Sequence, residues 1–194
     1  MSIHFGFSVE AKGQTPALIK QVHGNKWVEY SETGSHPEAD AVWTSQANTE
    51  VYVFTADCMP VLLYTPTLVS AIHCGWRGAM KGIVGAGISE FKKPVLHSII
   101  GPCIKRCCFE VREDFIEQFE KAGHSLSSFL SGSNKHWYFD LPRFVIETQL
   151  RDLEPDQIDL RENRCTVCSS DNLPSFRRTR KTDPHIRAWI YYKG

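Results

Sequence analysis

The sequence lacks an excess of either charge, and it lacks long apolar runs. Its 194 residues include 22 Lys and Arg against 22 Asp and Glu, so the formal net charge is zero. A nucleic-acid scaffold usually carries a basic excess, and a membrane-spanning helix needs roughly 18 or more consecutive apolar residues. We therefore expect no nucleic-acid partner and no membrane partner, although a local basic pocket for a small anion is compatible with this composition.

Features of a secretion signal are also missing. Met1 to Gly6 contains no basic region followed by a long apolar stretch, which predicts a cytoplasmic protein. Seven cysteines are many for this length, but an odd number without a secretion signal argues against a complete disulfide framework. We expect reduced thiols, some of them buried and some functional. The length suits one domain with a substantial core.

Apolar spacing predicts a mixture of strands and helices. Short runs rich in β-branched and aromatic residues indicate strands, whereas apolar residues three and four apart indicate helices. Asp140 has the character of a helix N-cap, with Pro142 tolerated in the first turn. The pattern predicts an α+β fold with a mixed sheet core and helices outside, with strands at 51–55, 61–64, 68–72, 95–100 and 186–192 and helices at 79–91, 113–121 and 141–150.

Three residues at predicted strand breaks are candidate metal ligands. Cys58 follows Asp57 between two strands, His73 ends a strand, and His23 precedes Gly24, which permits a tight turn. Two His and one Cys form a known catalytic zinc set that leaves the fourth position open. Because 35 and 15 residues separate the three, the spacing alone favours a buried structural Cys and two ordinary histidines.

Two arginine-containing segments are candidate anion sites. Arg77, between Trp76 and Gly78, precedes the predicted helix, where backbone N–H groups and a guanidinium favour phosphate. Arg177 and Arg178 could add charge to the same pocket. The alternative for each segment is an exposed arginine on a solvated loop.

A Cys-x-x-Cys pair at Cys165 and Cys168 suggests a different site. Together with Cys103 and Cys107 it could form a four-cysteine structural zinc site. A thioredoxin-like redox role is the alternative, but the pair does not stand at the start of a helix after a strand. A mutual disulfide between the adjacent Cys107 and Cys108 would be strained.

Several segments, taken together in this order, resemble the bacterial YfiH-like family, also called laccase-domain or polyphenol oxidase family proteins. The resemblance runs from about Phe5 to the C-terminus, and its motifs are specific as a set. They are Gln-Val-His-Gly at 21–24, Ala-Asp-Ala at 39–41, Thr-Ala-Asp-Cys-Met-Pro-Val-Leu-Leu at 55–63, His-Cys-Gly-Trp-Arg-Gly at 73–78, Ile-Gly-Pro at 100–102, Cys-Cys-Phe-Glu-Val at 107–111 and Ser-Phe-Arg-Arg at 175–178.

The resemblance implies a fold, a metal site and an activity. It implies a single enzyme domain over residues 1–194, with mixed β-sheets in a sandwich-like core and flanking helices. It implies that His23, Cys58 and His73 bind one metal, zinc or alternatively copper. The implied substrates are purine nucleosides and phosphate, with phosphorolysis of adenosine, inosine or methylthioadenosine and deamination of adenosine.

Within that chemistry, Asp57 is a candidate proton carrier or orienting group. Arg77, supported by Arg177 or Arg178, is a candidate phosphate ligand. Two departures from the family pattern stand near the N-terminus. The stretch between Gly6 and Gln21 is shorter than usual, and the family's Phe-Ser-Thr-Arg-like segment reads Phe-Ser-Val-Glu at 7–10.

Three other classes of function remain open at this point. Copper-dependent oxidation of phenols is suggested by the older family name, but multicopper oxidases need paired His-x-His ligands, which are absent from this sequence. Cys58 and His73 could instead act as nucleophile and base of an amide hydrolase that edits cell-wall peptide precursors. A non-enzymatic metal-binding module is the third class.

Overall fold

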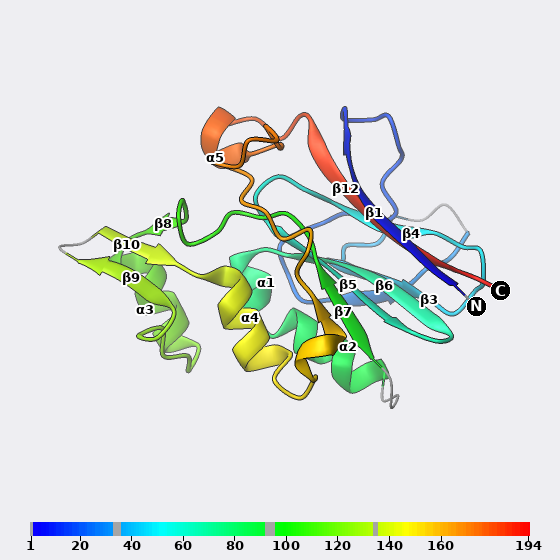
Figure 1. The fold of residues 1–194 in the computed structure, drawn as a ribbon, viewed down its shortest axis with the longest axis horizontal. Coiled ribbons are helices and arrows are strands. Elements are labelled where there is room, and N and C mark those ends of the chain that lie inside the picture. The colour runs from blue at the N-terminus through cyan, green and yellow to red at the C-terminus, as the bar shows by residue number, and fades with distance from the viewer. Residues whose placement is uncertain (1, 33–35, 92–95, 134–135) are drawn as a thin grey trace.

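The fold is built on a large mixed sheet, shown in the computed structural model in Figure 1, which describes residues 2–32, 36–91, 96–133 and 136–194. The inner pairs of strands are antiparallel, and the two outermost pairs, β11 with β7 and β2 with β3, are parallel. The strand order is β11 (Ile158–Asp159), β7 (His97–Ile100), β5 (Met59–Thr65), β6 (Leu68–Cys74), β3 (Ala41–Thr44) and β2 (Trp27–Glu29).

A smaller antiparallel sheet covers one face of the large one. Its strands are β1 (Ser2–Glu10), β12 (His185–Lys193) and β4 (Val51–Thr55), with β12 in the middle. Inward residues of β12 alternate with more exposed ones, as expected for a strand with one buried face. Ala188 and Ile190 pack with Leu62 of β5 and Val69 of β6 in one apolar layer between the two sheets.

Helices cover the opposite face of the large sheet. Val61 and Leu63 of β5, neighbours of the inward Leu62, point into this second apolar layer, because successive side chains of a strand face opposite sides. Figure 1 shows the helices below the large sheet and the small sheet above it. The layer contains residues of α1 (Trp76–Met80), α2 (Ile83–Phe91), α3 (Glu113–Lys121) and α4 (Leu141–Gln149).

A third sheet extends the molecule beside α3. It has the order β8 (Glu110–Val111), β10 (His136–Phe139) and β9 (Leu130–Ser133). Phe119, Phe139 and Phe144 are fully buried and make mutual ring contacts that join this sheet to α3 and α4. Two short elements complete the chain, the 3-10 helix at Pro155–Gln157 and α5 at Phe176–Thr179.

The predicted α+β sandwich with flanking helices is confirmed, and several elements match closely. Strand 51–55 and helix 113–121 have the predicted bounds, and the Asp140 side chain accepts a hydrogen bond from Arg143 N at 3.2 Å, as expected of an N-cap. The strand predicted from residue 95 is observed from His97, and residue 95 lies outside the described residues. None of the helices in the described ranges has the length and apolarity needed to cross a bilayer.

The single helix predicted at 79–91 is wrong. Two helices, α1 and α2, occupy this region, and the first begins at Trp76 rather than after Gly78. Gly82 between them has a φ of +74°, in the left-handed region that breaks a right-handed helix and suits glycine. Arg77 therefore lies in the first turn of a five-residue helix rather than ahead of a helix.

Candidate active site

The structure brings His23, Cys58 and His73 together although 35 and 15 residues separate them in the sequence. Cys58 lies in the turn between β4 and β5, His73 is near the end of β6, and His23 lies on the segment preceding β2. Their ligand atoms all lie within 4.8 Å of one another. The three predicted metal-ligating residues thus form one cluster.

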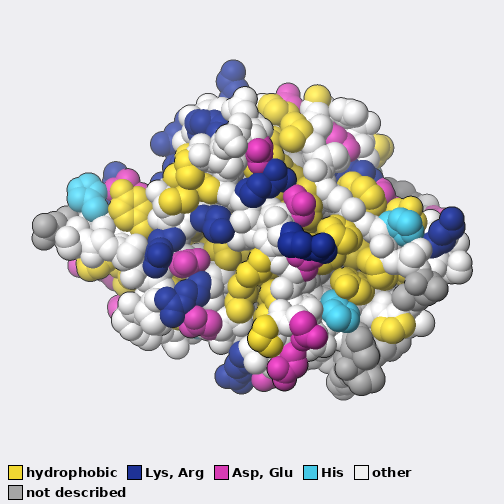
Figure 2. All heavy atoms as spheres, viewed as in Figure 1, with side chains coloured by type: hydrophobic (Ala, Val, Ile, Leu, Met, Phe, Trp, Pro, Cys, Tyr) yellow, Lys and Arg dark blue, Asp and Glu magenta, His cyan; other side chains and the backbone are white. Residues whose placement is uncertain are grey.

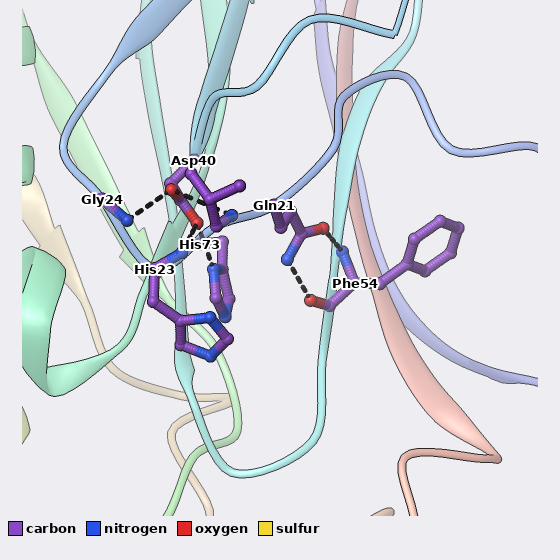
Figure 3. A network of polar contacts seen from close by, with 7 residues as sticks. Gln21, His23, Gly24, Asp40, Phe54 and His73 are labelled. Atoms are coloured by element: carbon purple, nitrogen blue, oxygen red, sulfur yellow. Dashed lines mark hydrogen bonds and ion pairs between the residues drawn. The ribbon is translucent and has the colours of Figure 1, made fainter.

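A buried carboxylate fixes two of these residues. Asp40 is fully buried, and its Oδ1 faces Nδ1 of His73 at 2.8 Å. Its two oxygens also accept hydrogen bonds from the backbone N–H groups of His23 at 2.9 Å and Gly24 at 2.6 Å. Figure 3 shows these bonds converging on Asp40 while both imidazole rings point to the same side. Because Nδ1 of His73 is directed to the carboxylate, Nε2 is left for a ligand.

Gln21 ties the His23 segment to the small sheet. Its side-chain amide donates to Phe54 O at 2.7 Å and accepts from Phe54 N at 2.8 Å, so it pairs with β4 as another strand would. Figure 3 shows this pair beside the Asp40 network. His23 itself has a φ of +59°, an uncommon conformation for a residue with a side chain. Hydrogen bonds on both sides of His23 hold that turn in place.

Close packing around Cys58 requires a glycine. A Cβ atom at Gly75 would lie 3.0 Å from Cys58 Sγ and 3.3 Å from His23 Cδ2. Both contacts are tighter than ordinary van der Waals distances, so a larger residue at position 75 would displace the cluster. The glycine of the His-Cys-Gly-Trp segment is therefore explained by the space that the two side chains need.

Charges within the cluster oppose the effect of burial. Burial alone would raise the pKa of the Cys58 thiol, but His73 and His23 beside it lower that pKa to about 6. Burial would likewise lower the pKa of His73, whereas Cys58 and Asp40 raise it to about 9. The metal-free cluster therefore favours a thiolate next to an imidazolium.

The cluster opens into a pocket of about 970 Å³. Apolar and aromatic side chains provide much of the wall, and cationic residues stand at several points. Lining residues include His23, Cys58, His73, Phe54, Trp76, Phe109, Leu141, Phe176, Lys12, Arg177, Arg180 and His185. A pocket of this size fits a nucleoside-sized ligand.

Asp57 connects the pocket to the segment around α5. Its carboxylate accepts a hydrogen bond from Thr166 Oγ1 at 2.6 Å and another from Arg177 N at 2.5 Å. Its φ is +88°, and it is 8% exposed. Both oxygens are already hydrogen-bonded, so the geometry suits a positioning residue better than a proton carrier.

The three predicted phosphate ligands lie in different environments. Arg77 is exposed and its guanidinium stacks over the Trp76 ring at 4.2 Å, but Arg77 is not among the pocket-lining residues. Arg178 donates to the carbonyl oxygens of Thr166, Val167 and Leu173 at 3.1, 3.0 and 2.5 Å. Those bonds engage its guanidinium in holding the chain.

Arg177 is the predicted arginine that lines the pocket. Its Nη1 donates to Glu110 O at 3.0 Å, and its guanidinium lies 5.6 Å from the centre of the Phe109 ring. In Figure 2, acidic and basic side chains are intermingled over the face shown, so positive charge on that face is local. The Lys and Arg side chains that line the pocket are those of Arg177, Lys12 and Arg180.

Sequence reasoning missed several residues of this site. Asp40 belongs to the Ala-Asp-Ala motif, but its sequence context assigns it no role, and no motif marks Arg180, Lys12 or His185 as pocket residues. The left-handed φ of +60° at Arg180, which ends α5, has no clear sequence signal. Asp40 could have been found, since a lone acidic residue directly before a strand of buried apolar residues calls for a partner.

A second cluster contains four of the remaining cysteines. The Sγ atoms of Cys107, Cys108, Cys165 and Cys168 all lie within 4.8 Å of one another. The predicted group of Cys103, Cys107, Cys165 and Cys168 is therefore wrong in one member. Cys103 is fully buried outside the cluster, and its thiol accepts a hydrogen bond from Asn163 at 3.4 Å.

The donor set of the first cluster fits a divalent metal. Imidazole nitrogen and thiolate sulfur are the donors that zinc prefers, and three protein ligands leave a fourth position for water or substrate. His73, oriented by a buried carboxylate, has the arrangement seen for metal-ligating histidines. Copper accepts the same donor types.

Comparisons with known proteins agree on one family. The profile of the family described as multi-copper polyphenol oxidoreductase laccase matches residues 6–192. A purine nucleoside phosphorylase of Aquifex aeolicus is 36% identical over 162 residues, which cover 81% of this chain and 74% of that protein. Purine nucleoside phosphorylase CA_C1699 of Clostridium acetobutylicum is 32% identical over 185 residues, covering 90% and 76%.

A solved structure of a similar protein has the same fold. The crystal structure of YlmD from Geobacillus stearothermophilus superposes with a TM-score of 0.79 at 25% identity, covering 92% of this chain and 73% of that one. Sequence and fold therefore agree, and the chain belongs to the multi-copper polyphenol oxidoreductase laccase family, the YfiH-like proteins.

Proposed function

We propose that the protein is a metal-dependent purine nucleoside phosphorylase that also deaminates adenosine. The observation that carries the proposal is the cluster of His23, Cys58 and His73 facing a pocket of about 970 Å³. Relatives that are 36% and 32% identical bear the name purine nucleoside phosphorylase. Adenosine, inosine and methylthioadenosine are the substrates we expect.

The pocket wall suits a purine nucleoside with phosphate beside it. Aromatic side chains such as Phe54, Phe109 and Phe176 offer faces for a flat heterocycle. Arg177 offers a guanidinium fork for phosphate, and Arg180 lines the same pocket. Phosphorolysis breaks the bond between the ribosyl C1′ and the base nitrogen and forms one between C1′ and a phosphate oxygen, while the departing base takes up the proton that the attacking hydrogen phosphate loses. A cation beside the phosphate binds this nucleophile and holds it in position.

Two carboxylates would hold the groups that bind substrate and metal in position. Asp57 holds the backbone N–H of Arg177 and so sets the position of α5 at the pocket wall. Asp40 holds His23 and His73 in their orientations. A zinc or copper ion held by His23, Cys58 and His73 would supply the Lewis acidity that deamination requires.

A copper-dependent phenol oxidase is the weaker alternative despite the family's name. Efficient four-electron reduction of oxygen uses several copper ions with paired His-x-His ligands, and the sequence has eight histidines without such a pair. Within the described residues, one cluster of possible metal ligands contains histidine.

A cysteine hydrolase is the second candidate, and one observation favours it. Cys58, His73 and Asp40 form a chain in which the carboxylate holds Nδ1 of His73 at 2.8 Å and the ring adjoins the thiol. The same order of nucleophile, base and orienting group occurs in amide-cleaving enzymes. A metal bound through Cys58 Sγ would block the nucleophile, so metal occupancy separates the two candidates.

The test is to incubate the purified protein with adenosine, with and without phosphate, and to separate the products. We expect adenine and ribose 1-phosphate only when phosphate is present, and inosine from deamination. Cys58→Ser should abolish both activities, whereas Cys103→Ala, which alters a buried thiol outside the pocket lining, should retain them. Absence of any product from the folded, metal-loaded wild type would refute the proposal and direct attention to amide substrates.

A further inference from the structure

Four cysteines at a distance from the pocket cluster take no part in the proposed reaction. Cys107 and Cys108 lie in the turn before β8, and Cys165 and Cys168 lie in the turn leading toward α5. The two turns are 57 or more residues apart in the sequence, but the segment that leads into the first turn is joined to the second by backbone hydrogen bonds. Cys103 N donates to Arg164 O at 3.1 Å, and Thr166 N donates to Cys103 O at 3.0 Å.

The sulfur positions fit a tetrahedral ion. All four Sγ atoms lie within 4.8 Å of one another, and those of Cys107 and Cys168 are 3.4 Å apart. A zinc ion with Zn–S bonds of about 2.3 Å in tetrahedral geometry keeps its sulfur atoms about 3.8 Å apart. Small adjustments of the side chains, two of which (Cys107 and Cys168) are exposed, would therefore bring the four thiols to coordination distance.

Backbone groups around the cluster also suit thiolate ligands. The N–H groups of Lys105, Val167 and Cys168 are directed at Cys165 Sγ. Such N–H bonds stabilise sulfur that carries negative charge and act as an outer shell of a metal site. The guanidinium of Arg178, bonded to the carbonyl oxygens of Thr166 and Val167, adds positive charge beside the turn.

We propose that Cys107, Cys108, Cys165 and Cys168 form a structural zinc site, separate from the pocket cluster. Four protein ligands would leave no open position, which is typical of structural rather than catalytic zinc. The ion would clamp the turn before β8 to the turn before α5.

This clamp lies directly behind the pocket wall. Thr166, between two of the ligands, donates to Asp57, and Asp57 holds Arg177 N. Arg177 in turn donates to Glu110 O in β8, two residues beyond Cys108. In Figure 1, α5 lies near the segment that leads to β8. Loss of the zinc should therefore loosen α5 without removing any residue that faces the pocket.

Metal analysis of the purified protein tests the site without an activity assay. We expect two zinc equivalents per chain in the wild type and one in Cys168→Ser. Because the Cys168 side chain is exposed, its replacement by serine should leave the fold intact. Cys103→Ala is the matched control, because Cys103 adjoins the turns but is not part of the cluster, and it should retain two. One equivalent in the wild type together with one in Cys168→Ser would overturn the proposal.

X-ray absorption at the zinc edge identifies the ligands. In the His23→Ala/Cys58→Ser variant, where the pocket cluster is disabled, the remaining zinc should show four sulfur neighbours at about 2.3 Å and no imidazole. A mixed nitrogen and sulfur shell would contradict the assignment. An intact mass two hydrogens lower, which indicates a Cys107–Cys168 disulfide in place of zinc, would overturn it as well.

Discussion

Replacing Asp40 by Asn should weaken zinc binding without removing any ligand atom. The Asn oxygen can still accept the proton of His73 Nδ1, but its amide nitrogen would then face the N–H of Gly24, which now donates to the carboxylate at 2.6 Å. A buried donor without an acceptor costs about 1–3 kcal/mol of folding free energy. Loss of the carboxylate behind a ligating histidine typically lowers metal affinity about 10–100-fold, or about 1.4–2.7 kcal/mol.

The two effects can be measured separately. Urea unfolding of the metal-stripped protein gives the change in stability, and titration against a competing zinc chelator gives the affinity. The titration is best done in the Cys107→Ser/Cys168→Ser background, so that the second cysteine cluster does not compete. Glu38→Gln is the control, because Glu38 is exposed and pairs with Lys20 at the surface. Zinc binding by folded Asp40→Asn at wild-type affinity would refute the role given to Asp40.

Further predictions concern packing, ionisation and substrate. Gly75→Ala should lower zinc affinity, measured by the same chelator titration, because its Cβ would lie 3.0 Å from Cys58 Sγ; an unchanged affinity would show that the cluster can shift freely. Phe119→Ala should lower the free energy of unfolding by about 3–5 kcal/mol in urea, since Phe119 is fully buried, and a loss under about 1 kcal/mol would contradict the packing described. The rate of Cys58 alkylation in metal-stripped protein should rise with pH around a midpoint of about 6, because the reactive thiolate is present above the lowered pKa of Cys58. A midpoint near the usual thiol pKa of ~8.5 would contradict the lowered pKa. Arg177→Ala should raise the KM for phosphate about tenfold or more, and an unchanged KM would remove Arg177 from the phosphate site.

Most of the fold could be predicted because local patterns reflect burial. The run Val51–Thr55 is buried on both sides and consists of β-branched and aromatic residues, so its strand was evident. The N-terminal strand Ser2–Glu10 was not predicted, since its residues are mostly half-buried and include Gly6 and two Ser. It is defined by pairing with β12 at the other end of the chain, which no local pattern reveals. The division of the helix predicted at 79–91 into α1 and α2 follows from the left-handed φ of Gly82, which the apolar spacing does not indicate.

The candidate site was predicted through motifs more than through spacing. Spacing alone left His23, Cys58 and His73 ambiguous, because their proximity results from the pairing of distant strands. The four-cysteine cluster shows the same limit. A Cys-x-x-Cys pair predicts a partner pair of cysteines elsewhere in the chain. Whether Cys103 or Cys108 joins Cys107 in that pair depends on where the turn at 105–108 directs its side chains. The structure places Cys108 in the cluster, and Cys103 is buried outside it.

The most direct test of the central claim is to add zinc back to stripped protein while measuring adenosine phosphorolysis. We expect no activity in the stripped protein and a rise that saturates when the His23, Cys58 and His73 cluster is filled. The His23→Ala/Cys58→Ser variant should stay inactive at every zinc concentration. Phosphorolysis by the stripped protein, or by that variant, would contradict a catalytic metal at this site.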